Sequence, residues 1–291
     1  MLRRLLAVLC FALGAFGARA EPLLSVEGVV SPAWLERSDG SREPIGVGDA
    51  VDTGAHIATG PGARVLLRMG EGSALKLGAQ AAFAVDQLER ETRGESSLWR
   101  GALDVLRGAF RYTTTAVAAA RAERDLNVRV GSLVAGIRGT DVWGKAGPDQ
   151  DYIVLIEGRV TVARAGRDVQ LDQPRSMIVA PRDGSAPPVA RLSSERLAGL
   201  SAQTEILAGS GGAWRGGRYR VVIVTTVDET YARDLHSRLR AAGYPAELRT
   251  LEEEGSPLYQ VHLTQLGGER EARAVAQRLQ ALGYSDARSA R

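Results

Sequence analysis

Short apolar segments, separated by turns rich in glycine and proline, dominate the chain from Leu23 to about Pro181. They recur at a spacing of about 8 to 12 residues, which is typical of strands in an all-β domain. The clearest segments cover residues 25–30, 56–59, 63–69, 73–77, 152–156, 160–163 and 176–179. The pattern therefore predicts an N-terminal all-β domain built as a roll, a sandwich or a solenoid.

One segment interrupts this pattern. Residues 116–126 are rich in alanine and carry Arg121, Glu123, Arg124 and Asp125. This composition favours a short helix or a solvated excursion inserted between strands, with the charges on an exposed face.

The strand pattern stops at residues 181–188, which are rich in proline, glycine and serine and are expected to end the first domain. Ser193 can then cap a short helix. Leu197, Leu200 and Leu207 are predicted to lie on one side of that helix.

Glycines at 209–212 and 216–217 predict a flexible tether after this helix. Trp214 is the unusual residue within it. Its side chain is expected either to contact a partner or to dock on a neighbouring domain.

An internal repeat organises the C-terminal segment. Residues 219–221 recur at 259–261 and residues 238–244 recur at 278–284, both with an offset of 40 residues. Two copies of one supersecondary unit are implied. Each copy places four apolar residues on one face of a helix: Ala232, Leu235, Leu239 and Ala242 in the first, and Ala272, Val275, Leu279 and Leu282 in the second.

Each copy reads as strand, helix, strand, and a unit of this size cannot close a core alone. Together the two predict a ferredoxin-like α+β domain, βαββαβ, with a four-stranded antiparallel sheet and two helices on one face. Gly243 and Gly283 follow the helix ends, where a left-handed residue is needed. The other face of the sheet is expected to be open to a ligand.

The N-terminus has the features of a secretory signal peptide. Arg3 and Arg4 precede an apolar run over residues 5–16, and an Ala-x-Ala sequence ends at Ala20. We expect cleavage after Ala20, export to the periplasm and no stable membrane span afterwards. The sequence before Cys10 does not fit a lipoprotein site, and an uncleaved membrane anchor is the alternative.

Charge and composition narrow the function. Removing residues 1–20 takes away three arginines and no acid, leaving 34 basic against 34 acidic residues. A neutral chain argues against nucleic-acid binding, which depends on clustered positive charge. The only cysteine lies in the removed segment, so disulfides and thiolate chemistry are not expected.

No catalytic constellation is visible in the sequence. His56, His236 and His262 lack metal-ligand spacing, and neither a Gly-x-Ser-x-Gly elbow nor a phosphate loop occurs. We therefore predict a non-enzymatic protein without a metal or a cofactor.

The segment 134–143 reads as a strand, a tight corner and a strand, because Gly136 and Gly139 allow a sharp bend. It resembles the signature of the FecR-type periplasmic domain through Gly136, Arg138, Gly139, Thr140 and Asp141, to which we assign a structural role. Residues 48–54, 75–78 and 156–162 are similar to other landmarks of that family, so the resemblance covers about 45–180. The alternative is an ordinary buried β-corner.

The C-terminal repeat, with its paired Leu-x-x-x-Gly-Tyr endings, resembles the SPOR domain over residues 218–291. This resemblance implies binding of peptidoglycan glycan strands without stem peptides, on the open sheet face. The candidate glycan-binding residues are Arg220, Thr225, Tyr259, Gln260, His262 and Gln265, of which only one alternating set on each strand can face the ligand. The chain departs from the family pattern at Val222, Thr226 and Leu266.

These features predict a signal peptide (1–20), a FecR-like domain (21–180), a linker with a short helix and a tether (181–217) and a SPOR domain (218–291). The first hypothesis is an exported envelope protein that binds peptidoglycan, with a further envelope protein as a second partner. A second is signalling by analogy with FecR proteins, although only four residues precede the apolar run. A third is a structural protein whose SPOR fold has lost glycan binding and contacts protein.

Overall fold

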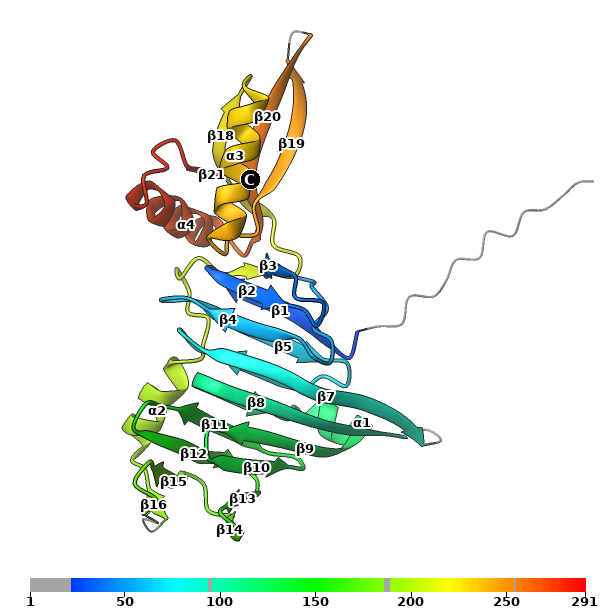
Figure 1. The fold of residues 1–291 in the computed structure, drawn as a ribbon, viewed down its shortest axis with the longest axis vertical. Helices are drawn as coiled ribbons and strands as arrows, with labels where there is room; N and C mark the ends of the chain where they lie inside the picture. Colours follow the sequence, from blue (N-terminus) through cyan, green and yellow to red (C-terminus); the bar gives the residue numbers. More distant parts are fainter. Residues whose placement is uncertain (1–21, 94–95, 186–188, 254) are drawn as a thin grey trace, which may run out of the picture.

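The computed structural model describes residues 22–93, 96–185, 189–253 and 255–291. The predicted signal peptide at residues 1–20 lies outside them. Figure 1 shows a large body of strands and, above it, a smaller body in which strands and helices combine. Within the described ranges, no helix is both long and apolar enough to cross a membrane.

The large body consists of two layers of mostly antiparallel strands that enclose one apolar core. In spatial order the first layer contains β17 (Ala213–Trp214), β1 (Leu24–Val30), β5 (Arg64–Met69), β6 (Ala74–Leu77), β8 (Ser96–Thr113), β11 (Asp141–Ala146), β12 (Gln150–Glu157), β15 (Ser176–Pro181) and β16 (Ala190–Arg191). The second layer contains β3 (Arg42–Pro44), β2 (Ala33–Glu36), β4 (His56–Thr59), β7 (Ala82–Arg93), β8, β9 (Ala122–Val130), β10 (Leu133–Ile137), β13 (Val160–Arg164) and β14 (Arg167–Leu171). The predicted strands and the all-β fold class are confirmed.

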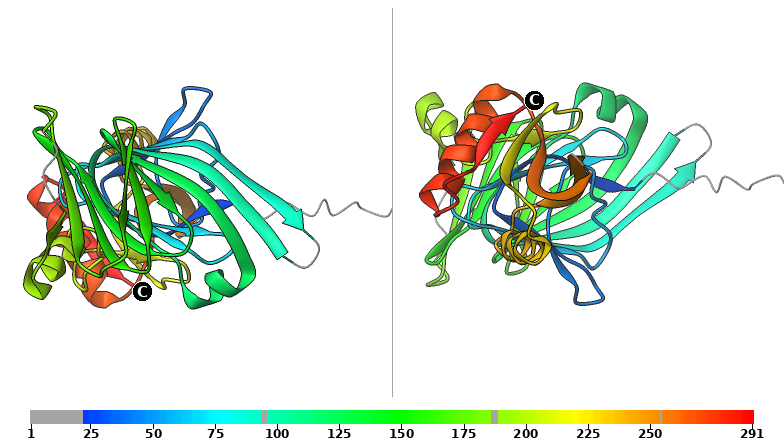
Figure 2. Two further views of the ribbon diagram at one scale, coloured as in Figure 1. Left: turned by 90° about the horizontal axis from the view of Figure 1, so that it is seen from below. Right: turned by 90° about the horizontal axis from the view of Figure 1, so that it is seen from above.

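The long strand β8 belongs to both layers and changes layer near Gly108. Its first part pairs with β7 and β9, and its last part pairs with β6 and β11. Gly108 has a φ of +85°, and a Cβ there would lie 2.6 Å from the Cα of Ala81. Only glycine meets both demands at this bend. Figure 2, along the long axis, shows the β7–β8 hairpin reaching away from the body.

The insertion after β8 contains the predicted short helix, α1 (Ala116–Arg121), but it differs from the prediction in two respects. The helix covers only the first half of the segment, because the chain continues directly from it as strand β9, parallel to β8. The Arg124 side chain is only 2% exposed and forms an ion pair of 3.1 Å with the equally buried Glu71. The expectation of a wholly exposed charged face is therefore wrong, because alternation along β9 turns Arg124 inward.

The helix α2 (Ser194–Ala202) begins at the predicted cap, where the Ser193 side chain accepts a hydrogen bond from the Arg196 amide. Leu197 and Leu200 pack against the outer face of the first layer, while Leu207 lies beyond the helix and is exposed. Strand β16 also pairs with β15. The chain after Pro181 therefore continues to cover the β-body, which corrects the expectation that this body ends there.

The small body has the predicted βαββαβ order, which confirms its fold class. It contains β18 (Tyr219–Thr226), α3 (Glu229–Ala241), β19 (Glu247–Glu253), β20 (Ser256–Leu266), α4 (Glu269–Ala281) and β21 (Arg288–Ala290). The strands lie in the order β19, β20, β18, β21, all antiparallel. Both helices pack on one face through the predicted apolar residues, except that Ala242 and Leu282 follow the helices and are exposed.

The two bodies share a joint where a loose tether was expected. Strand β17 pairs with β1 of the large body and, through Ala213 and Leu266, with β20 of the small body. Trp214 packs against Gly28 and Gly267, one from each body, which fits the predicted docking role. The expectation of a flexible tether is corrected, because backbone pairing holds this segment on both sides.

Candidate functional site

The face of the small sheet opposite α3 and α4 carries polar side chains. Across β18 and β20, Val222 lies opposite His262, and Thr225 lies opposite Gln260. Directly opposed residues in an antiparallel pair share one face of the sheet. The Gln260 Nε2 donates a hydrogen bond of 3.1 Å to the Thr225 hydroxyl. We name this surface the open face.

Several buried polar atoms on the open face have no hydrogen-bond partner among the described residues. They are the Gln260 Oε1, the His262 Nδ1 and the Arg220 Nε. Gln260 is 8% exposed and His262 is 5% exposed. Burying such atoms without a partner is unfavourable, so these groups are suited to hydrogen bonding with a ligand.

Charged side chains surround His262. Its Nε2 lies 3.4 Å from the Glu247 carboxylate. Burial lowers the pKa of His262 and the positive charges of Arg249 and Arg220 lower it further, whereas Glu247 raises it. Arg288 of β21 lies opposite Val222 on the same face. The open face thus combines three arginines with one glutamate around a partly enclosed histidine.

The structure separates the six predicted glycan-binding residues. Arg220, Thr225, Gln260 and His262 share the open face. Tyr259 lies on the helix side, where its hydroxyl donates to Glu229 of α3 at 3.1 Å, so its assignment to the open face is corrected. Gln265 lies at the end of β20, exposed, with a φ of +60°. Sequence reasoning missed Glu247, Arg249 and Arg288, which strand alternation exposes once the edge strands are placed.

The family departures lie mostly away from this face. Thr226 pairs with Tyr259 on the helix side, and Leu266 is buried in the core of the small body. Only Val222 lies among the polar residues of the open face. Two of the three departures therefore change packing rather than the surface offered to a ligand.

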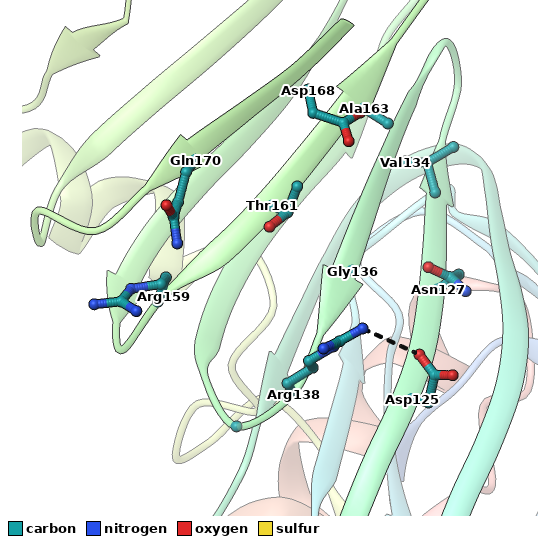
Figure 3. Close-up of a pocket in the computed structure, with 11 residues that line it drawn as sticks. Asp125, Asn127, Val134, Gly136, Arg138, Arg159, Thr161, Ala163, Asp168 and Gln170 are labelled. Atoms are coloured by element: carbon teal, nitrogen blue, oxygen red, sulfur yellow. Dashed lines mark ion pairs between the residues drawn. The ribbon is translucent and has the colours of Figure 1, made fainter. Parts of the chain in front are cut away.

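A second candidate surface surrounds the corner between β10 and β11. An open pocket of about 640 Å³ lies on the outer face of β9, β10, β13 and β14. Figure 3 shows its side chains, most of them polar, from these four strands and their connections. The lining includes Asp125, Asn127, Arg138, Arg159, Thr161, Asp168 and Gln170. We name it the signature groove.

The predicted signature residues divide between the groove and the body. Gly136, Arg138 and Gly139 line the groove, and Arg138, whose side chain is 82% exposed, pairs at 4.0 Å with Asp125. A Cβ on Gly136 would lie 3.7 Å from the Thr161 carbonyl oxygen. The absence of a side chain at Gly136 therefore leaves space at the base of the groove.

The other two signature residues are buried. The Asp141 carboxylate accepts two hydrogen bonds from Arg111, at 2.6 and 2.8 Å. Arg111 also bonds Glu205 at 3.0 Å, which links β8 and β11 to the chain after α2. Thr140 is buried, and its backbone amide donates to the Thr114 hydroxyl at 3.3 Å. These contacts are of the kind that fixes the corner in place.

We find no candidate metal site among the described residues. No group of three His, Cys, Asp or Glu side chains there is placed to hold a metal ion.

Comparisons with known proteins agree with the two-body architecture. The family described as FecR protein matches residues 55–161, and the family described as SPOR domain matches residues 216–288. A comparison with curated proteins found no match.

Matches to solved structures were also found. Two crystal structures of a "putative anti-sigma factor" from Parabacteroides distasonis are 11% and 12% identical to this chain, each with a TM-score of 0.38. The first alignment covers 70% of this chain and 98% of that protein, and the second covers 69% and 96%.

Proposed function

Because this chain joins a FecR domain to a SPOR domain, we propose that it is an exported envelope protein that holds peptidoglycan glycan strands on the open face. SPOR domains bind peptidoglycan, and the fold of the small body leaves the corresponding face without a helix. Residues 218–291 would attach the protein to the cell wall in the periplasm.

The unpaired buried atoms of the open face are the observation that carries this proposal. The Gln260 Oε1 accepts hydrogen bonds, the Arg220 Nε donates them, and a neutral His262 Nδ1 can do either. A sugar hydroxyl both donates and accepts, so a glycan strand can satisfy all three. Thr225, already bonded to Gln260, would complete the polar row.

The charge of the open face favours a glycan without stem peptides. Around His262, Arg220, Arg249 and Arg288 outnumber Glu247, while Glu253, on the same face by alternation, lies at the far end of β19. A stem peptide is attached by an amide bond to the lactyl carboxyl group of a muramic acid residue, and its hydrolysis frees a carboxylate there. Arginine side chains form strong charge-assisted hydrogen bonds with carboxylates.

The FecR domain would act as the interaction or sensing module. Its signature groove offers two arginines and two aspartates around amide and hydroxyl side chains, which suits a polar partner with charges of both signs. An envelope protein is the partner class that we propose for it.

Periplasmic signalling is a second candidate, and the joint between the bodies favours it. The Trp34 indole donates to the Ala241 carbonyl oxygen at 3.1 Å, and the Ala33 amide donates to the Gly243 carbonyl oxygen at 3.0 Å. Occupancy of one body could therefore influence the other through direct contacts. In this signalling hypothesis, the open face of the small sheet contacts a protein instead of a glycan.

Retention on cell-wall sacculi tests the proposal. The chain from Glu21 to Arg291 should bind sacculi whose stem peptides have been removed more strongly than intact sacculi. Replacing Gln260 or His262 with alanine should weaken retention about tenfold, because each removes a hydrogen-bonding group from a buried position. Tyr259→Phe is the matched control, since that side chain lies on the opposite face.

Equal retention on both kinds of sacculi, or none on either, would contradict glycan binding. Retention that responds to Tyr259→Phe but not to Gln260→Ala would show that a different surface is used. In either case, cross-linking to envelope proteins then becomes the informative measurement for the signalling alternative.

A further inference from the structure

A second cavity lies beneath α2, away from both surfaces described above. It has a volume of about 440 Å³ and opens between α2 and the outer face of β11, β12 and β15. Figure 1 shows α2 beside this part of the sheet. Its main lining residues are Trp143, Lys145, Tyr152, Met177, Arg196 and Leu200. This size falls within the range of about 300 to 1,000 Å³ that is usual for small-molecule sites.

The walls of this cavity are apolar and aromatic. Trp143 is 1% exposed and belongs to a small cluster with Met177 and Leu192, against which Tyr152 and Leu200 also pack. The Trp143 Nε1 is buried and has no acceptor within the described chain. An indole donor of this kind usually finds a partner when it is buried. The cavity therefore combines an apolar body with a hydrogen-bond donor.

Two cations border the apolar walls. Lys145 of β11 and Arg196 of α2 both line the cavity, and no acidic side chain does. Neither cation forms an ion pair with any of the residues described. The nearby acids are engaged elsewhere, because Asp141 bonds Arg111, while Glu205 bonds Arg111 and Lys76. The cavity is positively charged at its edge.

Gly199 lies inside α2 and faces this cavity. Glycine in a helix interior is less stable than alanine, so it usually has a packing reason. Here a Cβ would meet no atom within 4 Å, and Gly199 does not have a positive φ. Neither backbone conformation nor close packing requires glycine, but its missing side chain leaves the cavity open on the helix side.

We propose that this cavity binds a small organic carboxylate with an aromatic or aliphatic body. The body would lie against Trp143, Met177 and Leu200, and the carboxylate would lie between Lys145 and Arg196. A gap left by imperfect helix packing would explain the volume, but not two unpaired cations together with a glycine on its wall. The inference is independent of glycan binding, since the cavity lies on the other body.

Binding of two probe anions tests this assignment. Isothermal titration of the chain from Glu21 to Arg291 with 1-naphthoate and with octanoate should show saturable binding of at least one. The neutral analogues 1-naphthylmethanol and octanol should bind about tenfold more weakly or worse, because they lack the charge-assisted hydrogen bonds.

Variants then locate the site. Lys145→Met and Arg196→Met should each weaken binding of the anion about tenfold, whereas Arg167→Met removes an exposed arginine elsewhere and should not. Gly199→Phe should abolish binding by filling the cavity. Ala198→Phe adds the same bulk at an exposed neighbouring position that does not line the cavity, and should preserve binding.

The assignment is overturned if neither anion binds the unaltered chain, if neutral analogues bind equally, or if Gly199→Phe leaves binding unchanged. Should Gly199→Phe also lower thermal stability more than Ala198→Phe does, the two charge variants decide the matter. Retention on sacculi should be unaffected by Gly199→Phe, which keeps this result separate from the glycan proposal.

Discussion

The two copies of the C-terminal repeat fold alike but are used differently. Each helix ends at a glycine with positive φ, Gly243 at +83° and Gly283 at +98°. A Cβ on Gly243 would lie 2.7 Å from the Trp34 ring of the large body, whereas a Cβ on Gly283 would meet no atom within 4 Å. The same glycine therefore ends a helix in both copies and makes an interface in only one.

The second copy contacts the large body by other residues. Glu271 of α4 accepts hydrogen bonds from the amides of Gly209, Gly211 and Gly212, at 2.5 to 3.0 Å, and the equivalent residue in α3 is the exposed Tyr231. Arg278 donates to the carbonyl oxygens of Ser31 and Ser210. A repeated sequence therefore specifies the shared fold, whereas the docking uses one residue that differs between the copies, Glu271, and two that recur in both, Gly243 and Arg278.

Replacing each of the two glycines with alanine should give the largest difference in stability between the two copies. Gly283→Ala adds only the strain of a left-handed alanine, about 1 kcal/mol. Gly243→Ala adds that strain and an overlap with Trp34, for a total of about 3 kcal/mol. Urea unfolding of the chain from Glu21 to Arg291 measures both. Equal losses would show that the Trp34 contact contributes nothing to stability.

Removing the carboxylate of Glu271 should have the next largest effect. Glu271→Ala leaves three backbone amides without their charged acceptor, which costs about 2 kcal/mol. Tyr231→Ala, at the equivalent position, should change stability by about 0.5 kcal/mol or less, because it is a surface substitution. Thermal unfolding gives the two values, and hydrogen exchange at Gly209, Gly211 and Gly212 should accelerate only in Glu271→Ala. Unchanged exchange would mean that β17 alone fixes this segment.

Local periodicity explains which parts of the fold could be predicted. The βαββαβ order, the helix ends at Gly243 and Gly283 and the corner at Gly139 all follow from spacing along the chain. The interface with Trp34 could not be found this way, because it joins residues about 200 positions apart. The burial of Arg124 was missed because a helical pattern was assumed where a strand begins.

The residues of the open face could also be predicted only in part from the sequence. Alternation along β20 correctly places Gln260 and His262 together on the open face. Register shifts lie between Tyr219 and Val221 and again between Val222 and Val224, so simple counting along β18 does not predict the pairing. The arginines of β19 and β21 could be added only after those edge strands had been placed.

The smallest expected difference between the two copies is in how their equivalent residues make the stability depend on pH. His262 is the second-copy equivalent of Val222, and its pKa in the folded chain is lowered, mainly by burial. The unfolded chain has the ordinary pKa of about 6.5, so below that pH it binds a proton that the folded chain resists. This contribution to stability is present above about pH 6.5 and is lost as the pH falls toward the lowered value.

His262→Val makes the two copies alike at this position and should therefore reduce the fall in stability between about pH 7.5 and pH 5. His236 of α3 also has a pKa lowered by burial, and Arg240 contributes to this, so part of the dependence should persist in His262→Val. Urea midpoints at the two pH values provide the measurement. The same pH dependence in the variant and in the unaltered chain would show that His262 is not held neutral by its surroundings, and the polar row of the open face would then carry a further positive charge.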